Sequence, residues 1–172
     1  MKKFISLFVI LTALVCLMTA CGETTVTSND GRFSVEIPSG WVKEDINEEA
    51  VLGVMSSEKE QYVSVFVEEK SSFEEGFTLD DFAAIAYVDL QEAFEDATMF
   101  DISADITVAN DISAKRYTLS GFESDLAKEV KISVVAFEGD DVFYKFVFWA
   151  TPEEYKDGEQ IFLKMLDTFK KQ

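Results

Sequence analysis

The chain has 172 residues, with 15 lysines and arginines, 33 aspartates and glutamates and no histidine, and its formal net charge is −18 at pH 7. Such a negative charge repels phosphate, so nucleic acids and anionic lipid headgroups are not expected as partners, because both are bound chiefly through Lys and Arg. The lack of histidine excludes Ser-His and Cys-His catalytic groups and the usual zinc sites.

Residues 1–20 have the pattern of a secretory signal peptide. Lys2 and Lys3 supply positive charge, and apolar residues fill most of positions 4–18. As a helix at about 1.5 Å per residue, this stretch spans only ~23 Å, which is less than the ~30 Å hydrocarbon core of a bilayer. A permanent transmembrane anchor is therefore the weaker interpretation, and we predict that the leader is removed.

The leader ends in small residues that precede a cysteine: Thr19 and Ala20 stand before Cys21. This segment resembles the lipobox of bacterial lipoproteins, although Met18 stands where that family usually has leucine. The resemblance implies cleavage between Ala20 and Cys21 and a diacylglyceryl group on the Cys21 thiol. The alternatives are an ordinary secreted protein with Cys21 as a free thiol, or an uncleaved anchor.

Lipid on Cys21 would place the protein on the extracytoplasmic face of the cell membrane, with the membrane as a partner. Two acyl chains suffice for stable attachment, since each buried methylene contributes ~0.8 kcal/mol. Residues 21–31 are predicted to form the lipidated N-terminus and a short polar tether that reaches at most ~35 Å. Because Cys16 leaves with the leader, residues 32–172 are expected to form one domain without a disulfide.

The domain opens with a strand pattern. Phe33, Val35 and Ile37 alternate with polar residues, which places them on one face of a strand. A proline turn follows, and Trp41 is expected to fold back over the core. The first strands are expected at residues 32–37, 50–56 and 61–70.

The spacing of the apolar residues then changes from that of a strand to that of a helix. Thr78 and Asp81 have the spacing of a capping box, and apolar residues recur at helical spacing, so a helix is expected over residues 79–97. The acidic residues on its other side are interpreted as a solvated face in preference to a cation site. They are Asp81, Asp89, Glu92 and Asp96.

Strands return in the second half of the domain, near residues 102–109, 112–120, 126–138 and 142–149. The last strand is apolar on nearly both faces, which predicts a central place in a sheet covered on both sides. Thr151 and Pro152 are expected to open a closing helix as its N-cap and first residue. Its predicted buried stripe is Tyr155, Ile161, Phe162, Met165, Leu166 and Phe169, and Lys164, Lys170 and Lys171 are placed toward its carboxyl end.

The domain resembles the PsbP and DcrB superfamily in four segments, residues 33–41, 79–82, 112–117 and the closing aromatic strand with residues 151–155. The resemblance implies an α+β fold, in which a central antiparallel sheet of about six to seven strands lies between helices on its two faces. Members include a photosystem-associated extrinsic subunit, a nuclear Ran-binding protein and bacterial lipoproteins, mostly described as binding or assembly factors. No catalytic constellation comes with the family.

Carboxylates are the only abundant functional groups. Adjacent pairs such as Glu68 and Glu69 point in different directions on regular structure. Residues 45–49 offer oxygens at alternating positions but lack the glycine of a calcium loop. No phosphate-binding glycine motif is present. We therefore predict no catalytic residue, metal or cofactor, and two carboxylates that converge from distant positions are the one enzymatic alternative.

These observations predict a membrane-anchored, non-enzymatic binding or assembly module at the cell envelope, whose partner is an envelope or membrane protein. The alternative is a small-ligand carrier that uses a cavity between sheet and helix. Aromatic residues motivate this alternative, and the candidate wall residues are Trp41, Phe143 and Trp149.

Overall fold

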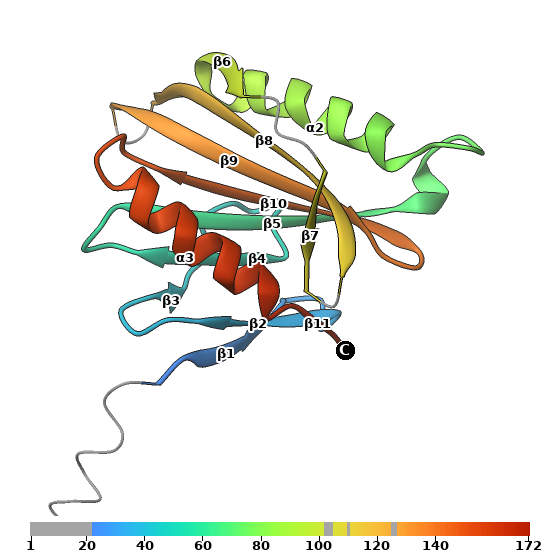
Figure 1. The fold of residues 1–172 in the computed structure, drawn as a ribbon, viewed down its shortest axis with the longest axis horizontal. Coiled ribbons are helices and arrows are strands. Elements are labelled where there is room, and N and C mark those ends of the chain that lie inside the picture. Colours follow the sequence, from blue (N-terminus) through green and yellow to red (C-terminus); the bar gives the residue numbers. More distant parts are fainter. Residues whose placement is uncertain (1–21, 102–104, 110, 125–126) are drawn as a thin grey trace, which may run out of the picture.

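A computed structural model describes residues 22–101, 105–109, 111–124 and 127–172. Ala20 and Cys21 lie outside the described residues, so leader cleavage and lipidation stay predictions from the sequence. Among the described residues, every helix is too short or too polar to cross a lipid bilayer. The fold is α+β, as predicted, with a large antiparallel sheet between two helices (Figure 1).

The described residues form an eight-stranded sheet in the order β3-β4-β5-β10-β9-β8-β6, in which β7 also pairs with β8. All of these pairings are antiparallel. The sequence did not predict β3 and β6, which extend this sheet at its two edges, whereas the predicted strand at residues 32–37 lies in a second sheet. The strands are β3 (Val42–Lys43), β4 (Leu52–Ser56), β5 (Gln61–Glu69), β6 (Glu95–Asp101), β7 (Asp105–Val108), β8 (Ile112–Glu123), β9 (Lys128–Glu138) and β10 (Val142–Ala150).

Helices α2 (Leu79–Ala93) and α3 (Tyr155–Asp167) cover opposite faces of this sheet (Figure 1). Strand β10 lies between β5 and β9 and is buried at all nine positions, which confirms its predicted central place. Apolar side chains on both faces of β10 therefore serve two cores. The α3 side includes Phe137, Phe146, Phe148, Phe162 and Leu166, and the α2 side includes Ala86, Leu90, Ile132, Val134 and Trp149.

A second, three-stranded sheet corrects the predicted tether. Strand β1 (Thr24–Thr27) pairs with β2 (Phe33–Ile37), and β11 (Lys170–Lys171) pairs with the other edge of β2. Residues 24–27 thus belong to the folded part, although the sequence placed residues 21–31 in a polar tether. Threonine and valine suit a pleated strand, so the segment pairs where β2 offers a free edge.

The ends of both helices also differ from the prediction. The capping box of α2 is confirmed, since Thr78 Oγ1 accepts from Asp81 N at 3.3 Å and Asp81 Oδ2 accepts from Thr78 N at 2.9 Å. However, α2 ends at Ala93 and not at residue 97. Phe94 is extended, with φ −118° and ψ 124°, and its ring lies 6.0 Å from that of Trp149. Packing of Phe94 on the sheet therefore overrides the helical period.

Helix α3 begins later than predicted. Thr151 is not its N-cap, because Glu154 N donates to Thr151 O at 3.1 Å in a turn and Glu154 itself precedes the first helical residue. Helix α3 ends at Asp167, where Thr168 Oγ1 donates to Met165 O at 2.7 Å and accepts from Glu36 N at 2.8 Å. These bonds turn the chain, so Lys170 and Lys171 form β11 and do not extend the helix.

Candidate functional site

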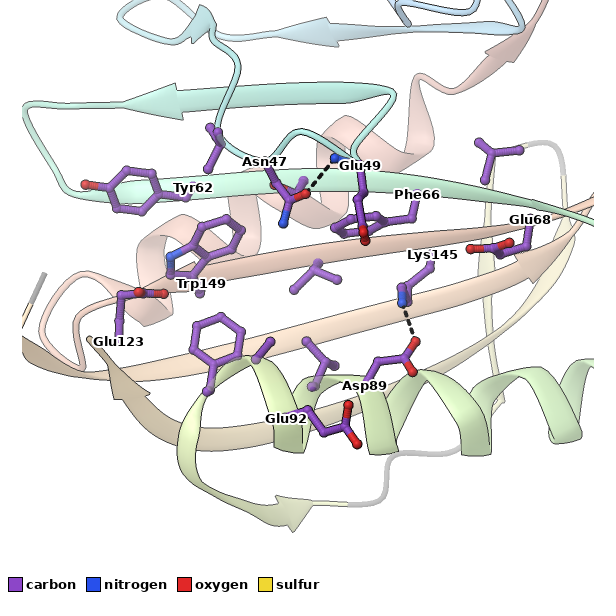
Figure 2. Close-up of a pocket in the computed structure, with 17 residues that line it drawn as sticks. Asn47, Glu49, Tyr62, Phe66, Glu68, Asp89, Glu92, Glu123, Lys145 and Trp149 are labelled. Atoms are coloured by element: carbon purple, nitrogen blue, oxygen red, sulfur yellow. Dashed lines mark hydrogen bonds and ion pairs between the residues drawn. The ribbon is translucent and has the colours of Figure 1, made fainter. Parts of the chain in front are cut away.

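A groove of about 740 Å³ opens on the α2 side of the sheet. Its floor is formed by β5 and β10, one wall by α2, and the other wall by the loop of residues 44–51 between β3 and β4 (Figure 2). Helix α2 packs against β8, β9 and β10. The groove lies beside the helix over β5, and its volume is within the range of about 300–1,000 Å³ that is usual for ligand sites.

The floor follows from strand alternation. Alternate residues of β5 over 62–68 and of β10 over 145–149 line the groove, and the antiparallel register sets residues of the two strands directly opposite one another. The ring of Tyr62 stacks on that of Trp149 with centroids 5.4 Å apart, which makes one end of the floor aromatic. The cross-strand pairs are Tyr62 with Trp149, Ser64 with Val147, and Phe66 with Lys145.

Gly53 allows the loop wall to lie close over β4. Glu44 N donates to Gly53 O at 3.0 Å, and a Cβ at Gly53 would stand only 2.1 Å from Glu44 O. A side chain at this position would therefore displace the loop. Asn47 Oδ1 accepts from Glu49 N at 2.8 Å and shapes the tip of the loop, from which Ile46, Asn47 and Glu49 line the groove.

An ion pair crosses the groove from floor to helix. Lys145 is 8% exposed, and its Nζ lies 2.8 Å from Asp89 Oδ2 of α2 and 4.9 Å from the centre of the Phe66 ring (Figure 2). Lys145 is the one cation among the described residues that line the groove. Because Asp89 neutralises it, Lys145 is poorly placed to attract an anionic ligand.

The two partners of this ion pair predict unequal mutational effects. Asp89→Asn leaves a buried ammonium without its charge partner and is expected to lower the free energy of unfolding by about 1–3 kcal/mol. Lys145→Met is expected to cost less than ~1 kcal/mol, because methionine packs in the same space and the Asp89 side chain, 51% exposed, returns to water. Urea denaturation of both variants at pH 7 measures the difference. Equal losses, or a larger loss for Lys145→Met, would contradict this account.

Ser64 supplies an unpartnered polar group in the groove. The residue is 2% exposed, it lines the groove, and its Oγ has no hydrogen-bond partner among the described residues. A buried hydroxyl without a partner costs about 1–3 kcal/mol. Sequence reasoning missed this residue, although a serine between Val63 and Val65 is a visible polar break at a floor position of a valine-rich strand.

The rim of the groove is acidic. Carboxylates come from the loop, the floor strand, the helix and β8, namely Glu49, Glu68, Glu92 and Glu123 (Figure 2). Of these, Glu49, Glu68 and Glu92 form no ion pair with any residue that the structure describes. Burial raises the pKa of Tyr62, so its hydroxyl is neutral at physiological pH. The groove therefore combines negative potential with neutral aromatic surface.

The structure separates the residues that the sequence singled out. Trp149 lines the groove, as the carrier alternative expected. Trp41 instead packs in the core on the α3 side, and Phe143 stacks on Phe82 with ring centroids 4.8 Å apart, so neither residue is a wall residue.

The predicted acidic helix face is also divided. Asp89 and Glu92 line the groove, Asp81 caps the helix, and Asp96 lies in β6, beyond the end of α2. Residues 45–49, which lack the glycine of a calcium loop, form part of the loop wall. In the part of the chain that the structure describes, no group of three or more Asp, Glu, Cys or His side chains has the arrangement of a metal site.

A second polar cluster lies on the α3 side. Tyr155 OH donates to Glu159 Oε1 at 2.5 Å, and the Arg116 guanidinium pairs with the same oxygen. Burial, followed by the hydrogen bond to Glu159, raises the pKa of Tyr155. These contacts join α3 to β8, and we interpret the cluster as a structural link between the two elements.

No protein-family model matches this chain, and no curated protein matches it. Several solved structures, in contrast, are similar to this chain. The Ran-binding protein Mog1p of Saccharomyces cerevisiae has a TM-score of 0.61 at 13% identity, over 87% of this chain and 95% of that chain. CyanoP, the cyanobacterial PsbP of Synechocystis, has a TM-score of 0.61 at 11% identity, over 87% and 92% of the two chains.

LpqN of Mycobacterium tuberculosis, described as involved in cell envelope biogenesis, has a TM-score of 0.58 at 11% identity, over 88% of this chain and 91% of that chain. Identities this low show a shared fold and not a shared activity. The predicted resemblance is confirmed at that level, and the chain has a PsbP-like fold.

Proposed function

We propose that this chain is an exported lipoprotein, anchored to the extracytoplasmic face of the cell membrane through Cys21, and that it acts as a non-enzymatic binding module at the cell envelope. The recognition site is the groove between α2 and the loop of residues 44–51. The observation that carries the proposal is this open groove, which holds an unpartnered buried hydroxyl at Ser64. A signal-peptide pattern before Cys21 supports the location.

The similar structures support a binding role. Mog1p is described as Ran-binding, and LpqN is described as involved in cell envelope biogenesis. The non-enzymatic character is a prediction from the sequence, which has no histidine. Carboxylates from several elements do line the groove, so turnover of a ligand is a measurable alternative.

Filling the groove is expected to abolish partner binding. Ala93 is exposed at the end of α2 and lines the groove, so Ala93→Trp places a large ring there without disturbing the core. Ala84 is exposed on the same helix outside the groove, and Ala84→Trp is the matched control. Tagged full-length wild type and Ala84→Trp, each purified from detergent-solubilised membranes of the native host, should recover a stoichiometric envelope protein. The Ala93→Trp variant should not recover it.

The proposal fails if the Ala93→Trp variant recovers the partner as well as the control does. It fails also if the functional wild type repeatedly recovers no partner at moderate salt. Quantitative mass spectrometry of the three eluates distinguishes these outcomes, because each recovered protein is scored relative to the bait.

A small-ligand carrier is the second candidate, and the groove volume of about 740 Å³ with its stacked Tyr62 and Trp149 rings favours it. Native mass spectrometry of the full chain released from detergent should then show a retained small molecule. The Ala93→Trp variant should lose that added mass and the Ala84→Trp variant should keep it.

A further inference from the structure

We infer that the groove recognises a peptide segment of a protein partner in which lysine or arginine stands beside an aromatic or aliphatic side chain. This inference rests on the proposed function and names the chemistry of its ligand. Charge, surface type and hydrogen-bonding capacity of the groove each point to such a segment.

The charge of the groove selects a cation. Lys145 and Asp89 neutralise each other, while Glu49, Glu68 and Glu92 have no ion-pair partner among the described residues. The chain as a whole carries a net charge of −18, which adds to the negative potential in the groove. An anionic segment would be repelled, and a lysine or arginine side chain would gain carboxylate partners from the loop, β5 and α2.

The floor selects an apolar neighbour for that cation. Tyr62 and Trp149 are stacked, and the Phe94 ring meets Trp149 edge-to-face with centroids 6.0 Å apart. Aromatic faces accept apolar side chains and also attract ammonium and guanidinium groups. Lys145 over the ring of Phe66 shows this second contact already made within the groove. A segment that places a basic residue at the rim and an apolar residue on the floor would use both surfaces.

Ser64 supplies the evidence for a hydrogen-bonding ligand. Its Oγ lies on the floor between the aromatic end and the ion pair, and it has no partner in the described structure. A peptide offers backbone N–H and C=O groups at regular intervals, so a segment that lies along β5 would present one of them to this hydroxyl. Purely apolar ligands would leave Ser64 unsatisfied.

Isothermal titration calorimetry on the full-length chain in nonionic detergent tests the inference with three short peptides. In the first, lysines flank one phenylalanine; in the others, glutamine or glutamate replaces the lysines. The lysine peptide is expected to bind at least about tenfold more tightly than the glutamine peptide, and the glutamate peptide most weakly. Among the three peptides, added salt should weaken only the binding of the lysine peptide, because its contacts with the rim carboxylates are solvent-exposed.

A triple variant is expected to weaken binding of the lysine peptide by about tenfold, at about twofold for each carboxylate removed. It combines Glu49→Gln, Glu68→Gln and Glu92→Gln. The control removes the same charge from exposed acids outside the groove, by Glu58→Gln, Glu74→Gln and Glu153→Gln, and should leave the affinity within about twofold. Ser64→Ala should weaken binding by about fivefold while the protein stays folded.

Equal affinities for the lysine and glutamine peptides, or equal losses in the two triple variants, would overturn the inference. The absence of binding by all three peptides would overturn it as well. The proposed function is tested separately by the recovery of the native partner. If the groove binds a ligand of other chemistry, these peptide results fail while Ala93→Trp still loses the native partner.

Discussion

Replacing Phe146 with alanine is expected to lower the free energy of unfolding by about 3–5 kcal/mol. Phe146 is fully buried at the centre of β10. Its ring centroid lies 5.7 Å from that of Phe33 in β2, 5.6 Å from that of Phe137 in β9 and 6.1 Å from that of Phe169 after α3. Truncation therefore opens a cavity where the large sheet, the small sheet and the segment after α3 meet.

Urea denaturation of the full chain, followed by tryptophan fluorescence, measures this loss. Phe146→Leu keeps most of the volume and is expected to cost less than ~1.5 kcal/mol. Val88→Ala removes an apolar side chain from the outer face of α2, where the residue is 51% exposed, and should change stability by less than ~0.5 kcal/mol. A similar loss for Phe146→Ala and Val88→Ala would show that Phe146 does not organise the core.

Replacing Cys21 with serine is expected to abolish the lipid anchor of the protein. The hydroxyl of serine does not take the place of the thiol as lipid acceptor, and each methylene of a lost acyl chain removes ~0.8 kcal/mol of membrane affinity. Detergent partitioning and intact-mass analysis of protein from the native host should show the lipid on the wild type and none on Cys21→Ser.

Cys16→Ser provides the matched control, because Cys16 is the other cysteine of the chain and lies within the predicted leader. This variant should be cleaved, lipidated and membrane-bound like the wild type. Wild-type protein that carries a bare thiol at residue 21, or that keeps its leader, would contradict the lipoprotein assignment. The groove would then need to be tested in a secreted or an uncleaved protein.

The position of β1 bears on how the anchor would hold the domain. Pairing with β2 begins at Thr24, so few residues separate the predicted lipid from the folded part. At about 3.5 Å per residue, this linker reaches only ~10 Å, in place of the ~35 Å of the predicted tether. If Cys21 is lipidated, the domain is therefore expected to stay against the bilayer, and a partner would have to reach it at the membrane surface.

Periodicity alone was sufficient for most of the elements. The apolar alternation of β2, the capping box at Thr78 and the doubly apolar β10 are local patterns, and they predicted strands, helix and sheet centre correctly. Such patterns work because side-chain direction repeats every two residues in a strand and about every 3.6 in a helix. Composition alone likewise excluded histidine chemistry, since the chain contains no histidine.

Tertiary structure alone decided where these elements end and what they enclose. Phe94 leaves the helical period to pack on Trp149, and residues 24–27 become a strand because β2 offers them an edge. The groove joins the loop of residues 44–51, β5, α2 and β10, which are far apart in the chain, and it exists because α2 packs against β8, β9 and β10 and leaves β5 uncovered. A local pattern shows which face of an element is buried. Only the packed fold decides how far its neighbour covers that face.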